Sequence, residues 1–142
     1  MTAVATVLDT NVLVAGLRSR RGASFQLLQL VGASDAFHIC LSVPLVLEYE
    51  AVVKRQAREL GLKLGEVDSV LDYLCSVAAM HEVFFLWRPV LRDPRDDFVL
   101  ELAVSAGCET IVTFNQRDFA GAEAFGIGIE RPREFMKRIG VT

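Results

Sequence analysis

Acidic residues stand at four separated places in the chain, and together they could hold a divalent metal ion. Asp9 interrupts the apolar stretch AVATVLDTNVLVAG, and the other three are Glu48, Asp97 and Asp118. A buried carboxylate is costly unless it is paired or coordinates a metal, and four carboxylates brought together repel one another. An all-oxygen ligand set without His or Cys selects Mg²⁺ or Mn²⁺. Such an ion supports the hydrolysis of phosphodiester bonds.

The elements that would position these acids alternate along the chain. Short apolar runs rich in Val, Ile and Phe predict strands, and apolar residues at i, i+3 and i+4 predict helices. We expect strands at 3–8, 37–42, 82–87, 110–114 and 126–130, and helices at 11–18, 25–33, 44–61, 65–79, 98–107 (starting in RDPRDD) and 132–139. Alternation of this kind predicts one α/β domain over residues 1–142, built on a mainly parallel sheet.

This arrangement predicts that the four acids meet at one edge of the sheet. In a parallel α/β sheet, the carboxyl ends of the strands and the amino ends of the helices share the edge where ligands bind. Asp9 and Asp118 follow predicted strands, Glu48 lies near the first turn of a predicted helix, and Asp97 opens another. Taken singly, Asp9 or Asp97 could be a helix cap and Glu48 a solvated helix residue. The predicted convergence of all four favours a metal site.

Composition excludes several other classes of protein. The net charge of −3 is not that of a basic nucleic-acid-binding chain, so any nucleic-acid contact must use a local patch. The chain has Cys40, Cys75 and Cys108 with no CxxC pair, which fits neither a zinc site nor a disulfide framework and favours a reducing cytosol. The amino terminus lacks the basic region of a signal peptide. The apolar segment 67–87 carries Asp72, His81 and Glu82, so we interpret it as a core helix and a strand rather than a membrane span.

Several motifs resemble those of one known family. VLDTNVLVAGL resembles the opening motif of the PIN-domain ribonucleases, SVPLVLEYEAVVKR their second acidic motif, and DPRDDFVLELAVSAGCETIVTFNQRDF their third and fourth motifs combined. The ending IGIERPREFMKRI resembles the last strand and helix of one subfamily, the toxin components of toxin–antitoxin pairs. This resemblance implies a three-layer α/β/α sandwich around a parallel sheet of about five strands. It also implies metal-dependent cleavage of single-stranded RNA.

The resemblance also implies roles for individual residues. The acids that would hold Mg²⁺ or Mn²⁺ are Asp9, Glu48, Asp97 and Asp118, with Asn11, Thr113 and Asn115 orienting acids or water. Two neighbours, Asp96 and Glu50, are the alternatives to Asp97 and Glu48; helical spacing favours Glu48, which lies one turn from Leu45 and Val52. The fourth motif reads TFN where many relatives have a Gly and an Asp, which leaves Asp118 as its acid.

Further expectations concern partners. A basic loop after the first predicted helix and one residue beside Asp118 would contact RNA phosphates: Arg18, Arg20, Arg21 and Arg117. The resemblance implies a cognate antitoxin and a homodimer, and the apolar helix 65–79 beside LVLEY suggests surface for self-association. Two other functions stay open at this point. One is a structure-specific nuclease for DNA or ribosomal RNA processing, and the other is a non-catalytic PIN-like binding module.

Overall fold

The strands in the described part of the chain form one parallel sheet, as the sequence predicts. The structure is a computed structural model that describes residues 3–83 and 94–141. The sheet has five strands in the order β3-β2-β1-β4-β5. In chain order they are β1 (Val4–Leu8), β2 (Phe37–Leu41), β3 (Ala79–Met80), β4 (Thr110–Val112) and β5 (Gly128–Glu130). The central strand β1 pairs with β2 on one side and β4 on the other, so its carboxyl end stands in the middle of the sheet edge.

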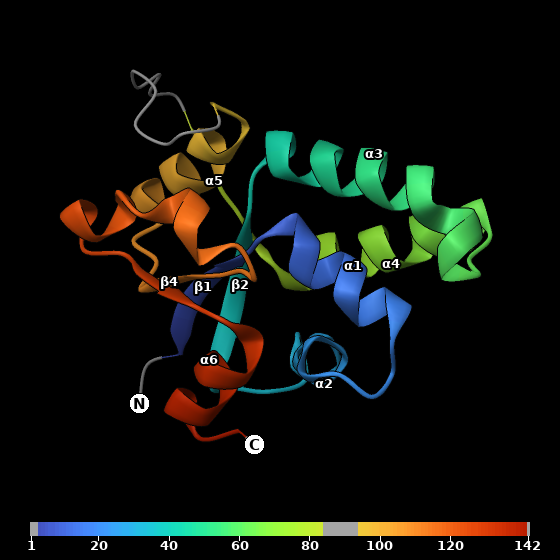
Figure 1. The fold of residues 1–142 in the computed structure, drawn as a ribbon, viewed down its shortest axis with the longest axis horizontal. Coiled ribbons are helices and arrows are strands. Elements are labelled where there is room, and N and C mark those ends of the chain that lie inside the picture. The colour runs from blue at the N-terminus through green and yellow to red at the C-terminus, as the bar shows by residue number, and fades with distance from the viewer. Residues whose placement is uncertain (1–2, 84–93, 142) are drawn as a thin grey trace.

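Helices cover both faces of this sheet (Figure 1). They are α1 (Thr10–Arg18), α2 (Ala23–Leu30), α3 (Val43–Leu60), α4 (Leu64–Val77), α5 (Pro94–Ser105) and α6 (Pro132–Ile139), with short 3-10 helices η1 (Gln116–Phe119) and η2 (Ala122–Phe125). The connections from β1 to β2 to β3 carry α1–α4 on one face, and the connection back to β4 carries α5 on the other. The helix α6 packs beside α2. These layers confirm the three-layer α/β/α fold expected from the sequence.

The ends of the helices follow from local capping residues. Ser42 caps α3 by accepting a hydrogen bond from the Leu45 amide, and Gly61 ends it with a φ of 71°. The predicted helix 25–33 instead spans Ala23–Leu30. It ends early because Gly32 has a φ of 78° and because the Tyr73 hydroxyl donates a hydrogen bond of 2.6 Å to the Val31 carbonyl.

The third strand lies earlier in the chain than the sequence predicts. Glu82 and Val83 belong to no strand, and the rest of the predicted strand 82–87 falls outside the described residues. The chain instead leaves α4 at Val77 and pairs Ala79–Met80 with β2, followed by a hydrogen bond of 2.8 Å from the His81 amide to the Leu41 carbonyl. Ala78 and Ala79 are apolar and would continue the helical pattern, so the sequence alone does not mark the end of α4. The helix ends at Val77 because the next residues pair with the open edge of β2.

The interior is apolar and includes one face of the helix predicted at 65–79. Val67, Leu71 and Leu74 are buried, so much of the apolar surface expected there is used within the chain itself. Cys40 and Cys108 are buried, as expected of small core residues, and none of the three cysteines forms a disulfide bond within the described structure. No helix in the described part of the chain combines the length and the apolar character needed to cross a membrane.

Candidate active site

Asp9 occupies the junction between the central strand and the first helix. Its amide donates to the Val112 carbonyl at 2.9 Å, which continues the pairing of β1 with β4 by one residue. Its Oδ1 accepts from the Thr10 amide at 2.8 Å, and its Oδ2 accepts from the Thr113 hydroxyl at 2.8 Å. Asp9 is therefore the N-cap of α1. The same side chain also lines the cavity described below, so its role as a cap does not exclude the metal-binding role proposed from the sequence.

Glu48 reaches the same place from α3. The Thr10 hydroxyl donates to Glu48 Oε2, and the hydroxyl of the next residue, Tyr49, donates to the Leu8 carbonyl. These two hydrogen bonds fix α3 against the end of β1. Glu50, the alternative to Glu48, instead pairs with Lys54 at 3.2 Å, and Lys54 also pairs with Asp68 at 3.0 Å. The structure thus turns Glu48 and not Glu50 towards Asp9.

The segment after β4 supplies a polar network around the hydroxyl of Thr113. Thr113 Oγ1 donates to Asp9 and accepts from Asn11 Nδ2 at 3.3 Å and from the Asn115 amide at 3.0 Å. Asn11 Oδ1 in turn accepts from the Phe114 amide at 3.3 Å. The three residues expected to orient the acids or water therefore form one connected network, in which Thr113 is fully buried.

These groups surround a cavity of about 590 Å³, called the acidic cavity below. Its walls come from α1, from one face of α3 and from the segment after β4. The lining residues are Asp9, Thr10, Asn11, Val14, Ala15, Arg18, Glu48, Val52, Gln56, Phe114, Asn115 and Asp118. The structure therefore brings together three of the four predicted acids, each from a different part of the chain.

Burial and neighbouring charges act together on Asp9. Burial is the main cause that raises the pKa of Asp9, and the carboxylates of Glu48 and Asp118 raise it further, whereas the hydrogen bonds from Thr113 and Thr10 lower it. The carboxylate is 7% exposed. A cation in the acidic cavity would relieve both the desolvation and the repulsion.

The donor set fits a hard divalent cation that keeps part of its water. Among the residues whose side chains are described, no three His, Cys, Asp or Glu lie close enough together to hold a metal ion on their own. Mg²⁺ is usually bound through one or two carboxylates, waters and substrate phosphates rather than by an all-protein cage. The acidic cavity fits this mode of binding, since Asp9 and Glu48 offer carboxylates, Asp118 lies nearby, and its lining residues include no His or Cys.

The fourth predicted acid and three of the four predicted RNA-binding arginines are not among the residues that line the acidic cavity. Asp97 is buried in the first turn of α5 and is not among the residues that line the acidic cavity. Its neighbour Asp96 has a side chain outside the described part of the structure. Arg18 lines the cavity and donates to Gln56 Oε1 at 2.9 Å. The other three, Arg20, Arg21 and Arg117, are exposed and do not line it.

Sequence reasoning did not single out three residues that build the site. Thr10 orients Glu48, Tyr49 fixes α3 to β1, and Gln56 holds Arg18. The i, i+4, i+8 spacing of Glu48, Val52 and Gln56 was a usable signal for the face of α3 that lines the cavity. The roles of Thr10 and Tyr49 depend on contacts between α3 and the end of β1, and no local sequence pattern predicts contacts between segments so far apart.

Comparisons with known proteins agree with this architecture. The family profile described as PIN domain matches residues 5–117. One chain of the crystal structure of VapBC2 from Rickettsia felis bound to a DNA fragment from their promoter superposes with a TM-score of 0.61 at 16% identity, covering 90% of this chain and 98% of that one. No curated protein sequence matches the chain. The structural likeness shows a shared fold, and the profile covers most of the sequence that carries the acidic motifs. The chain therefore belongs to the PIN-domain family, the nuclease family that its motifs resemble.

Proposed function

We propose that the protein is a metal-dependent endoribonuclease that hydrolyses phosphodiester bonds of single-stranded RNA, as the toxin of a toxin–antitoxin pair. The observation that carries this proposal is the acidic cavity, where Asp9, Glu48 and Asp118 converge from three distant segments. Membership of the PIN-domain family supports a nuclease. The fold shared with a chain of VapBC2 supports the toxin role.

The residues of the chain have distinct tasks in this proposal. Asp9 and Glu48 bind Mg²⁺ or Mn²⁺, held in place by Thr113 and Thr10 respectively. A bound ion of this kind supplies a polarised phosphate oxygen and a more acidic water. Asp118 adds negative charge to the wall of the cavity, and Asn115 offers a polar group in the same lining. Asp97 remains a proposed ligand on α5, a helix that contacts β1.

Arg18 is placed to hold the substrate. Among the described residues that line the acidic cavity, Arg18 is the one basic residue. Its hydrogen bond to Gln56 fixes the direction of the guanidinium group. A guanidinium beside a cluster of acids attracts the phosphate rather than the metal ion. Arg20, Arg21 and Arg117 would extend the contact along the RNA backbone from exposed positions.

Cleavage assays with a matched pair of variants test the proposal. A labelled single-stranded RNA and a duplex DNA are each incubated with the protein in Mg²⁺, in Mn²⁺ and in EDTA. We expect RNA cleavage that needs the metal, and a loss of at least about a hundredfold in Glu48→Gln, because several kcal/mol of electrostatic stabilisation disappear. Glu50→Gln removes the same charge two residues away, from a side chain paired with Lys54, and should cleave like wild type.

The other outcomes separate the alternative functions. Preferred cleavage of the duplex DNA would favour a structure-specific nuclease. RNA binding without turnover in any metal would favour a binding module. Equal activity of the Glu48→Gln and Glu50→Gln variants would refute the assignment of the acidic cavity as the catalytic site.

Partners follow from the same proposal. We infer a cognate antitoxin protein, since the similar fold comes from a structure of VapBC2. A homodimer is supported by Val43 and Leu47 at the start of α3, which expose 62% and 58% of their surface. Three free cysteines fit a reducing compartment such as the cytoplasm.

A further inference from the structure

A second cavity, of about 530 Å³, adjoins the acidic cavity. It lies where α2 and α6 begin and is called the α2–α6 cavity here. The two cavities share Ala15, Arg18 and Phe114 in their walls, so they adjoin each other on either side of these residues. A chain bound in the acidic cavity could therefore pass directly into the second.

The start of α2 offers unpaired backbone donors to this cavity. Its N-cap is Gly22, which has no side chain to accept a hydrogen bond, and the helix begins at Ala23. The first amides of a helix lack partners within the helix and carry partial positive charge. Gly22, Ala23 and Ser24 all line the α2–α6 cavity, so an anion there would meet these donors.

Ser24 adds a hydroxyl that points to a ligand independently of the helix end. Ser24 is 3% exposed, and its Oγ has no hydrogen-bond partner among the described residues. A buried hydroxyl without a partner costs free energy, and its hydrogen can rotate to meet an incoming acceptor. In the structure this Oγ has almost no solvent-exposed surface, so an anion in the α2–α6 cavity would supply that acceptor only after the Ser24 side chain turns towards it.

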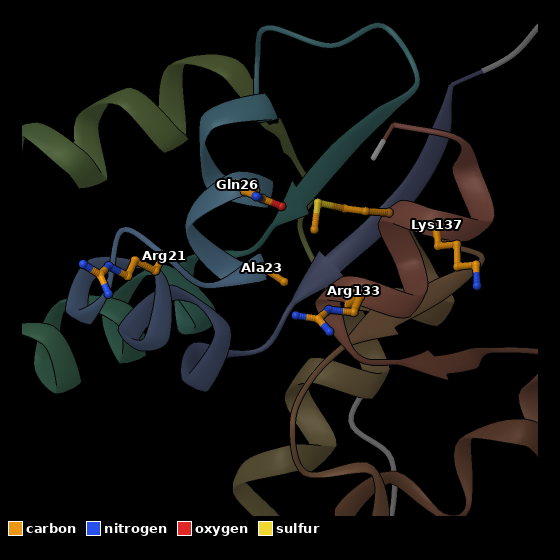
Figure 2. Close-up of a pocket in the computed structure, with 6 residues that line it drawn as sticks. Arg21, Ala23, Gln26, Arg133 and Lys137 are labelled. Atoms are coloured by element: carbon orange, nitrogen blue, oxygen red, sulfur yellow. The ribbon is translucent and has the colours of Figure 1, made fainter.

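The charges around the cavity are mainly positive. Arg18, Arg131 and Arg133 line it, and Figure 2 shows Arg133 extending from α6 towards Ala23 at the start of α2. The acidic residue in the lining is Glu134, whose Oε1 already accepts from the Arg131 amide at 2.9 Å and from Gln116 Nε2 at 3.3 Å. Its charge is thus partly satisfied by fixed donors.

We propose that the α2–α6 cavity binds a backbone phosphate of the RNA strand at a distance from the bond that is cleaved. This inference rests on the proposed function, because it extends the path of the same substrate. Phe114, 37% exposed, stands in the wall common to both cavities and offers a surface on which a base can stack. Alternation of an aromatic surface with cationic phosphate sites is typical of single-strand binding.

Binding of single-stranded RNA in EDTA, where no cleavage occurs, tests the cavity separately from catalysis. Arg133→Gln removes a cation from the cavity, and Lys63→Gln removes one from the exposed start of α4 as a charge-matched control. We expect Arg133→Gln to make the slope of log affinity against log salt shallower by about 0.7, the value for one phosphate contact on a single strand. The control should keep the wild-type slope.

A serine variant distinguishes a binding role from a structural one. Ser24→Ala should weaken RNA binding several-fold and leave the melting temperature unchanged or higher, because the lost hydroxyl has no partner in the folded chain. A lower melting temperature with unchanged RNA affinity would show that Ser24 only supports the fold, and would overturn its assignment here.

RNA oligomers with one neutral methylphosphonate linkage locate the phosphate. The wild type should lose affinity at one position away from the cleaved bond, and Arg133→Gln should show no further loss with that oligomer. Additive losses at every position would overturn the proposal.

The remaining outcomes separate this inference from the proposed function. If RNA is cleaved but Arg133→Gln behaves like Lys63→Gln, the cavity assignment is wrong and the nuclease stands. If wild type neither binds nor cleaves RNA, both fail. An oligoglutamate peptide that binds through Ser24 and Arg133 when RNA does not would identify a protein segment as the occupant, and would likewise overturn the proposal.

Discussion

The hydroxyl of Thr113 connects the acids to the segment after β4, and its replacement by valine measures what that connection contributes. Valine keeps the shape of threonine and removes the hydroxyl. The loss leaves Asp9 Oδ2 without the donor at 2.8 Å and removes an acceptor from Asn11 and from the Asn115 amide. Thr113→Ser, which keeps the hydroxyl, is the matched control.

The size of the effect follows from which groups can reach water. Asn115 is exposed and Asn11 is half-buried, so both can find solvent partners, whereas Asp9 is 7% exposed. A hydrogen bond to a charged group contributes about 1.5–3 kcal/mol. We therefore expect Thr113→Val to lower the free energy of unfolding by about 2 kcal/mol at neutral pH, from the Asp9 contact alone. In a domain of this size that lowers the melting temperature by roughly 8 °C.

The effect should depend on pH in a defined direction. Burial raises the pKa of Asp9 above its unfolded value, and the hydrogen bond from Thr113 partly offsets that rise. Without the hydroxyl the native pKa rises further. The stability lost in Thr113→Val is therefore complete above the native pKa of Asp9 and shrinks as acidification neutralises the carboxyl group in both proteins.

Urea unfolding in EDTA from pH 4 to pH 8 checks this reasoning. The free energies of unfolding of wild type and Thr113→Val should diverge as the pH rises, while Thr113→Ser stays near wild type. A loss that is the same at every pH, or equal in both variants, would show that packing and not the bond to Asp9 is the cause.

Three further predictions concern other parts of the molecule. The buried phenol of Tyr49 has a pKa raised well above its usual value, so the unfolded chain ionises first and the free energy of unfolding of the wild type falls above about pH 10. Tyr49→Phe should lose less stability above that pH. An identical alkaline slope of the two proteins in urea unfolding would contradict this. Replacing Arg20 and Arg21 by Ala should weaken RNA binding and flatten its salt dependence, and an unchanged slope would show that the loop does not touch RNA. Light scattering at micromolar concentration should give a dimer mass, because apolar side chains at the start of α3 are exposed; a monomer mass would refute self-association.

The sequence predicted the elements whose signals are local. The last helix spans 132–139 as expected, and the helix predicted to end at 107 ends at Ser105, just before Gly107, which has a φ of 67°. Glu48 was favoured over Glu50 by helical spacing alone, and the structure places it in the cavity. Each of these depends on residues within a few positions of one another.

What the sequence did not predict depends on contacts between distant segments. The place of β3 depends on the free edge of β2, and the hydrogen bond that orients the Glu48 carboxylate comes from Thr10, 38 residues earlier. Asp97 was expected beside the other acids because it opens a helix at the same sheet edge. It is buried in α5 and is not among the residues that line the acidic cavity, so its contact with a metal ion stays a prediction.

The sheet order also governs when the site can exist during synthesis. Asp9 is made early, but its partner Thr113 lies 104 residues later, and Asp118 follows after that. Because β4 pairs with β1, the wall that follows β4 reaches Asp9 only after the residues up to Asp118 have left the ribosome. A nascent or prematurely ended chain that stops before Thr113 has Asp9 but no assembled cavity. Any activity that depends on the acidic cavity would thus begin only after the segment that follows β4 has been made.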